Sequence, residues 1–150
     1  MTTLTNTLGT KTAITISLDS LASGTYVAAT AVDLTSSTPI DCLVEVTVVT
    51  TGTAVSGNAQ VQAFIQISQD GTNYSTGPTS GTTTTDEPDL YLIGNVPTKT
   101  VSSTHRKAFS IFAALGFVPR YFKLVCKDDL GTALSTGCSA SYQTVVGTST

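Results

Sequence analysis

Two segments of the chain alternate between apolar and polar positions. In residues 41–50 the even positions from 42 to 48 are apolar, and in residues 59–68 the odd positions from 61 to 67 are apolar. A period of two is typical of a half-buried β-strand. A loop rich in Gly and Thr separates the two segments, so we expect them to pair as a hairpin.

Six further segments have the pattern of extended strands: 12–17, 25–34, 90–93, 108–113, 121–127 and 138–146. Residues 108–115 also fit a short helical turn, since Phe109, Phe112 and Ala113 follow the i, i+3, i+4 spacing. About eight strands separated by Gly, Pro, Asn and Asp predict an all-β fold, an antiparallel and jelly-roll-like β-sandwich. We expect its core to contain Val44, Val46, Val48, Ile65, Ile67, Phe122 and Leu124.

The 150 residues fit one domain. We expect a β-sandwich domain at 11–146, an extended N-terminal arm at 1–10 and a C-terminal tail at 147–150, both able to lie on adjacent subunits. The segment 76–89 is poor in apolar residues. It is about as long as structureless loops become in compact domains, so we expect it to be mobile or docked on something.

The amino-acid composition indicates what kind of surface the protein has. The chain has 30 Thr and 16 Ser, while charged residues make up only 11%. Charged side chains keep the surfaces of soluble monomers apart. The low charge of this chain therefore favours a protein whose surface is covered by neighbouring subunits. The net charge of −3 argues against a nucleic-acid-binding protein, which is commonly basic.

Charge is distributed unevenly along the chain. Residues 1–98 hold eight acidic side chains and one basic side chain, whereas 99–150 hold six basic and two acidic ones. The six basic residues form a candidate interface that could meet an acidic surface. They are Lys99, Arg106, Lys107, Arg120, Lys123 and Lys127. The alternative is that basic and acidic strands are simply neighbours within one fold.

The sequence offers little for catalysis. His105 is the only histidine, and it lies in a polar, basic stretch typical of an exposed loop. No GxSxG, phosphate-binding or dinucleotide-binding motif occurs. The carboxylates Asp86, Glu87 and Asp89 could attract calcium but lack the spacing of an EF-hand. We therefore expect no enzyme activity and no cofactor or metal.

The three cysteines do not have the spacing of a zinc site or a disulfide framework. Cys42 and Cys126 lie in apolar strand patterns and are expected to be buried, whereas Cys138, beside Gly137, is expected to be more exposed. The chain start lacks the features of a secretory signal, and no apolar run reaches the length of a membrane span. We expect synthesis in a cytoplasm and no membrane partner.

Several segments resemble small virion structural proteins of tailed bacteriophages, in which they recur in the same order. They are Ser-Leu-Asp-Ser-Leu-Ala-Ser-Gly-Thr-Tyr (17–26), Ala-Val-Asp-Leu (31–34), Ser-Gln-Asp-Gly-Thr-Asn-Tyr (68–74), Leu-Tyr-Leu-Ile-Gly (90–94), Phe-Ser-Ile-Phe-Ala-Ala-Leu-Gly-Phe-Val-Pro (109–119) and Gly-Thr-Ala-Leu-Ser-Thr-Gly (131–137). The resemblance covers residues 14–146 and consists mainly of turns and alternating strands.

This resemblance implies a β-sandwich subunit located in the virion and assembled in the host cytoplasm, with no catalytic residues to carry over. A capsid decoration (cement) protein would bind the major capsid protein at many sites on the shell, often as a homotrimer. A tail, neck or fibre-attachment protein would bind tail or neck proteins instead. A third alternative, outside virions, is a carbohydrate-binding β-sandwich module. Such modules usually present an aromatic platform, whereas this chain has no Trp and five scattered Tyr.

Overall fold

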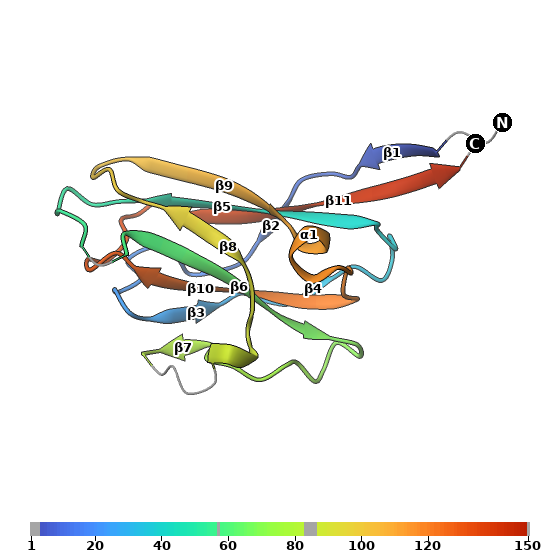
Figure 1. Cartoon of the computed structure of the whole chain (residues 1–150), viewed down its shortest axis with the longest axis horizontal. Helices are drawn as coiled ribbons and strands as arrows, with labels where there is room; N and C mark the ends of the chain where they lie inside the picture. The colour runs from blue at the N-terminus through green and yellow to red at the C-terminus, as the bar shows by residue number, and fades with distance from the viewer. Residues whose placement is uncertain (1–3, 57, 83–86, 150) are drawn as a thin grey trace.

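The computed structural model describes residues 4–56, 58–82 and 87–149, which form two antiparallel β-sheets packed face to face (Figure 1). In this part of the chain, sheet 1 comprises β1 (Leu4–Leu8), β2 (Thr12–Ile14), β5 (Asp41–Val49), β9 (Thr104–Ser110) and β11 (Ser139–Ser149). Sheet 2 comprises β3 (Tyr26–Ala28), β4 (Val32–Asp33), β6 (Gln60–Ser68), β7 (Ser80–Gly81), β8 (Tyr91–Pro97) and β10 (Tyr121–Asp129). The short helices are η1 (Glu87–Asp89), which is 3-10, and α1 (Ile111–Leu115). The all-β sandwich prediction is confirmed.

The two predicted strands with the clearest alternation, at 41–50 and 59–68, do not pair with each other. β5 lies between β11 and β9 in sheet 1, whereas β6 lies between β10 and β8 in sheet 2. The predicted hairpin of 41–50 with 59–68 is therefore wrong. Residues 50–56 lead from sheet 1 toward sheet 2, and the apolar faces of the two strands meet across the core instead of lying side by side. Hydrogen bonding of Ser56 N to Leu130 O, at 2.6 Å, holds the crossing segment in place.

The core between the sheets is built from the alternating positions. Of the seven residues predicted for it, Ile67 is partly buried and the others are fully buried. Cys42 and Cys126 are buried in the same core, as predicted, and burial raises the pKa of each thiol to about 12. At that value both thiols are protonated and behave as small apolar side chains. Cys138 is half-buried, and all three cysteines are free.

The outer face of sheet 2 is partly covered by the chain itself. Phe64, on the outward face of β6, is buried in a second cluster with Tyr26, Leu90 and Val125. Leu90 follows η1, so the end of the 76–89 segment folds back onto this face (Figure 1). Of that segment, residues 83–86 lie outside the described residues.

Two predicted strands end differently in the structure. Residues 25–34 divide into β3 and β4, and the strand predicted at 108–113 stops at Ser110, where α1 begins. The Ser110 hydroxyl accepts a hydrogen bond from Ala113 N at 2.9 Å, and Gly116 ends the helix with a φ of 80°. These are favourable N-cap and C-cap residues, so the helical-turn alternative is the correct one for residues 111–115.

Candidate functional site

The two ends of the chain form a two-stranded ribbon that projects from the sandwich. β1 pairs antiparallel with the last part of β11, from Leu8 opposite Val145 to Leu4 opposite Ser149. Figure 1 shows β1 and the last part of β11 extending beyond the rest of sheet 1. Within the predicted arm and tail, residues 4–6 therefore pair with residues 147–149, whereas residues 1–3 and 150 lie outside the described residues. A two-stranded ribbon is only marginally stable in water by itself, which makes it a candidate for packing against another molecule.

The ribbon begins where the edge strand breaks between β1 and β2. Gly9 lies at this break, where its N–H donates to Thr144 O at 2.8 Å and its carbonyl accepts from Gln143 Nε2 at 2.7 Å. A Cβ atom at Gly9 would collide with the Thr144 hydroxyl, so the close approach requires glycine. Lys11 then forms an ion pair with Glu45 on β5, at 2.6 Å. These contacts fix the base of the ribbon to sheet 1.

Four segments that carry exposed apolar side chains lie toward this end of the sandwich: the end of β1, the β4–β5 loop, α1 and the α1–β10 connection (Figure 1). The exposed fractions are 58% for Leu8, 47% for Ile40, 51% for Phe112 and 42% for Phe117. Ile40 N donates to Val145 O at 2.8 Å, so Ile40 lies at the base of the ribbon. We call these four residues the end surface. An exposed apolar cluster on a soluble protein commonly marks an interaction site.

Asp41 holds α1 in position within this surface. Its carboxylate accepts hydrogen bonds from the Ser110 hydroxyl at 2.7 Å and from Phe112 N at 3.0 Å. The first residue of β5 is therefore bonded to the first turn of α1, and this bond holds the backbone of Phe112 close to Asp41, the residue that follows Ile40. This contact could not be predicted from the sequence, because 69 residues separate Asp41 from Ser110.

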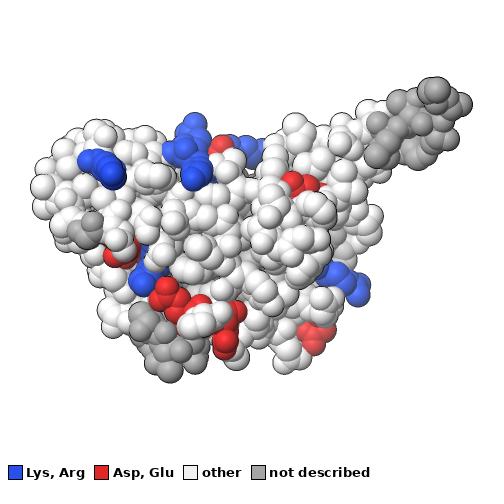
Figure 2. Space-filling model, viewed as in Figure 1, with Lys and Arg blue, Asp and Glu red and all other residues white. Residues whose placement is uncertain are grey.

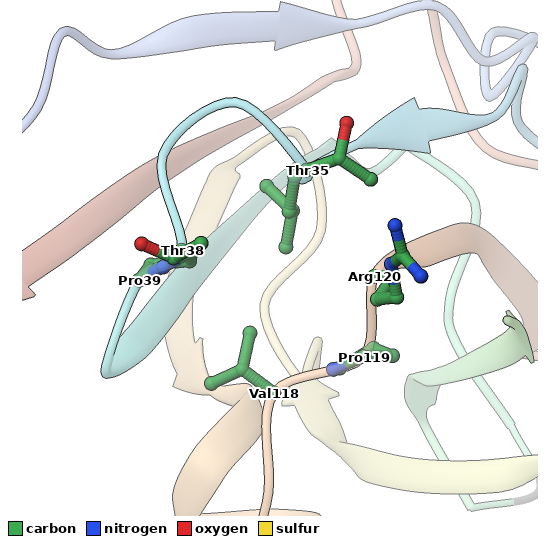
Figure 3. Close-up of a pocket in the computed structure, with 7 residues that line it drawn as sticks. Thr35, Thr38, Pro39, Val118, Pro119 and Arg120 are labelled. Carbon is green, nitrogen blue, oxygen red and sulfur yellow. The ribbon is translucent and has the colours of Figure 1, made fainter.

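A pocket of about 410 Å³ opens beside the end surface (Figure 3). Two chain segments line it: the β4–β5 loop, and the residues that join α1 to β10. The lining consists of Leu34, Thr35, Thr38, Pro39, Val118, Pro119 and Arg120. The two segments are tied by a hydrogen bond from Leu34 N to Arg120 O, at 2.9 Å. Apolar walls with a guanidinium and two hydroxyls suit an apolar side chain that has an acceptor group beside it.

The six basic residues of the predicted interface do not form one patch. Lys99 lies between β8 and β9, Arg106 and Lys107 lie on β9 in sheet 1, and Lys123 and Lys127 lie on β10 in sheet 2. Arg120 belongs to the pocket. Figure 2 shows the blue side chains as separate groups on the face in view.

Several of these basic side chains have partners within the fold. Arg106 lies 3.5 Å from Glu45 and donates to the Thr47 hydroxyl at 3.1 Å. The Nζ of Lys123 lies 4.2 Å from the centre of the Tyr74 ring. At Arg106, the basic strand β9 therefore lies beside Glu45 on β5.

Lys127 takes part in a compact polar cluster on sheet 2. It forms an ion pair with Glu87 at 3.2 Å, and the Tyr26 hydroxyl donates to the same carboxylate. Partial burial works against ionisation of Glu87, but the hydrogen bonds from Tyr26 and Lys127 together lower the pKa of its carboxyl below the usual value. The cluster attaches η1 to the sheet and leaves Glu87 occupied by protein partners.

Of the other two candidate calcium ligands, only Asp89 is among the described residues. Asp86 lies outside the described residues, and Asp89 accepts a hydrogen bond from the Thr76 hydroxyl at 2.5 Å. Within residues 4–56, 58–82 and 87–149, no three His, Cys, Asp or Glu side chains are grouped so that they could hold a metal ion. His105 lies on β9 and not in the exposed loop that the sequence predicted, and its Nε2 is 3.0 Å from the carbonyl oxygen of Thr100, in the β8–β9 connection.

Comparison with known protein families and with curated proteins finds no match. None of the described helices has the length and apolar character needed to cross a membrane.

Sequence reasoning missed the end surface. Ile40 and Phe117 lie outside the predicted strands, beside Pro39 and Gly116, and were not assigned to any face. One local feature of the sequence could have indicated these residues. A large apolar residue that stands alone beside a turn residue is not part of an alternating strand, so the strand pattern does not place it in the core.

Proposed function

We propose that this chain is a non-enzymatic structural subunit of a tailed-bacteriophage particle, and specifically a capsid decoration protein that binds and stabilises the head shell. Its partners are the major capsid protein and further copies of itself. The work it does is binding: a rigid sandwich presents the ribbon and the end surface to its neighbours.

The observation that carries this proposal is the combination of ribbon and end surface at one end of the molecule. Residues 5–8 are all exposed, and no other part of the described chain covers them. Exposed Ile40, Phe112 and Phe117 lie at the same end. Covering this region with a neighbouring subunit would bury apolar area and support the ribbon at the same time.

The resemblance of residues 14–146 to small tailed-phage virion proteins supports the phage particle as the assembly. We favour decoration of the shell over a place in the tail or neck, because a surface with so little charge suits a subunit packed among many neighbours and its separate basic groups would pair with acidic side chains on a shell. Repetition over many shell sites would add avidity to a modest individual contact. A location in the tail or neck is the alternative.

A specific observation also favours a second candidate function, carbohydrate binding. A hollow of about 460 Å³ is lined by Ser75, Thr76, Pro88, Asp89, Leu90 and Tyr91. Tyr91 is 41% exposed and lies two residues from the Asp89 carboxylate, and a ring beside an acceptor suits stacking and hydrogen bonding to a sugar. A glycan array tests this candidate: saturable binding that is lost in Tyr91→Ala would favour it over assembly.

An add-back experiment tests the decoration function. Particles are produced without this protein, the purified chain is added, and bound protein is measured after sedimentation. We expect saturable binding to heads and a higher temperature of shell disruption in the bound particles. Binding restricted to isolated tails would favour the alternative, and failure to bind either part would overturn the proposal.

A further inference from the structure

The free edge of β1 differs from the other sheet edges in the described part of the chain. β9, the opposite edge strand of sheet 1, carries the sequence Thr-His-Arg-Lys. In sheet 2, β8 ends in Pro97 and is shifted in register opposite Ala63 and Phe64. The strands β2, β4 and β7 have only two or three residues each.

Charges, prolines, bulges and shortness are the features that prevent a sheet edge from pairing with another chain. β1 has the sequence Leu-Thr-Asn-Thr-Leu, without charge or proline, and it pairs with β11 over five consecutive residues without a shift. Its partner β11 carries no charged residue either. An edge without such protection is suited to pairing with a further strand.

The backbone groups on this edge belong to the even-numbered residues of β1. Gly9 N donates to Thr144 O, which places a hydrogen-bonded pair at this position of the ladder. Bonded and non-bonded pairs alternate along antiparallel strands, so residues 5 and 7 direct their N–H and C=O groups toward β11. Leu4, Asn6 and Leu8 direct theirs to the free edge.

We propose that β1 pairs antiparallel with β1 of a second copy of this chain, about a two-fold axis at Asn6. Sheet 1 would then continue through both ribbons into the partner's sheet (Figure 1). The inference rests on the proposed function, because it names the partner of the ribbon in the assembly.

The occupant is a second copy because the edge is complementary to itself. The edge-facing residues 4, 6 and 8 are symmetric about Asn6, so a two-fold axis there matches each free N–H to a free C=O. Three pairs exchange roughly six hydrogen bonds in this register. The neighbouring Lys11 is paired with Glu45, which limits repulsion between copies. Two marginal two-stranded ribbons become one four-stranded sheet, which is a more stable unit.

Sedimentation equilibrium of the purified full chain tests this pairing. We expect a concentration-dependent dimer. Asn6→Pro removes the central edge N–H from each copy, and it should raise the dissociation constant roughly tenfold or more, because two hydrogen bonds are lost at once. The matched control Asn6→Thr keeps the N–H and should remain dimeric. A wild-type chain that is monomeric at all concentrations, or a dimer that Asn6→Pro leaves unchanged, would overturn the proposal.

Oxidative cross-linking provides a second measurement that does not depend on the proline variant. In the proposed register the two Asn6 residues are directly opposite each other, at a separation that a disulfide can span. Asn6→Cys should form a covalent dimer, whereas Leu8→Cys, which lies opposite residue 4 of the second copy, should form far less. Equal cross-linking of the two variants would contradict the register. A chain that dimerises through β1 but does not bind particles would contradict the proposed function and leave this pairing intact.

Discussion

The Asp41 carboxylate accepts a hydrogen bond from the Ser110 hydroxyl at 2.7 Å, and this contact connects the start of β5 to the start of α1. Because the same carboxylate also accepts from Phe112 N, at 3.0 Å, it fixes the position of an exposed aromatic residue of the end surface. The Asp41 carboxylate thus stabilises the fold and also positions part of the surface proposed for binding.

Replacing this carboxylate should loosen α1. Asp41→Ala removes the acceptor for Ser110 and Phe112, and we expect the free energy of unfolding to fall by about 1–2 kcal/mol, as for loss of a helix cap. Asp41→Asn keeps an acceptor oxygen and should lose less. Urea denaturation followed by circular dichroism measures both variants. Equal stability of Asp41→Ala and wild type would show that the contact does not hold α1.

Asp128 gives the protein a pH-dependent stability. Its side chain is buried, one of its carboxylate oxygens has no hydrogen-bond partner within the described part of the chain, and burial raises the pKa of the carboxyl to about 6. A raised carboxyl pKa favours the protonated form in the folded state. This contribution to stability is complete below the unfolded pKa near 4 and is lost as the pH rises through 6.

The variant Asp128→Asn removes this titration. At pH 8 we expect it to be more stable than wild type by about 2 kcal/mol, because no charge is buried. At pH 4 the two proteins should differ little. Thermal unfolding between pH 4 and pH 8 provides the test. If Asp128→Asn were more stable than wild type by the same amount at pH 4 and at pH 8, the pH dependence would not come from Asp128.

The end surface should govern binding without affecting folding. Phe112→Ser and Phe117→Ser change side chains that are 51% and 42% exposed, so the melting temperature should change little. The add-back assay should show binding to heads weakened tenfold or more, roughly the effect of losing a buried aromatic anchor. Val101→Ser is a matched control, since Val101 is also exposed but lies in the β8–β9 connection. An equal loss in the control would show that the effect is not specific to the end surface.

The basic residues of β9 test the electrostatic part of the account. Charge reversal in Arg106→Glu combined with Lys107→Glu should weaken particle binding and reduce its dependence on salt, while the chain stays folded. Reversal at Lys123, on the other sheet, is the comparison variant. If occupancy on particles is unchanged in the folded double variant, the basic residues of β9 do not contact the shell.

The alternating pattern predicted the strands well because successive side chains of a strand point to opposite faces. Val44, Val46 and Val48 are buried for this reason, and the same rule located Phe122 and Leu124. Strand pairing was harder to predict, because the period of two indicates which face is buried but not which strand lies alongside. β5 and β6 therefore appeared to be a hairpin, although they belong to different sheets.

The candidate site was less predictable. The basic residues between Lys99 and Lys127 are neighbours in sequence, but β9 and β10 belong to opposite sheets, so the fold separates them. The end surface is assembled from Leu8, Ile40, Phe112 and Phe117, which only tertiary contacts bring to one end. The predicted strand at 108–113 ends at Ser110 and is wrong beyond it. The Ser110 cap and the left-handed Gly116 favour a short helix there, although the apolar residues alternate as in a strand.

Immunogold electron microscopy of intact particles tests the central claim most directly. Antibody against this chain is applied to wild-type virions and to virions produced without the protein, which serve as the control. The account predicts gold distributed over the whole head of wild-type particles and absent from the control. Gold confined to the tail or to one vertex would contradict decoration of the shell, and no specific gold on any part of the particle would contradict a structural role in the virion.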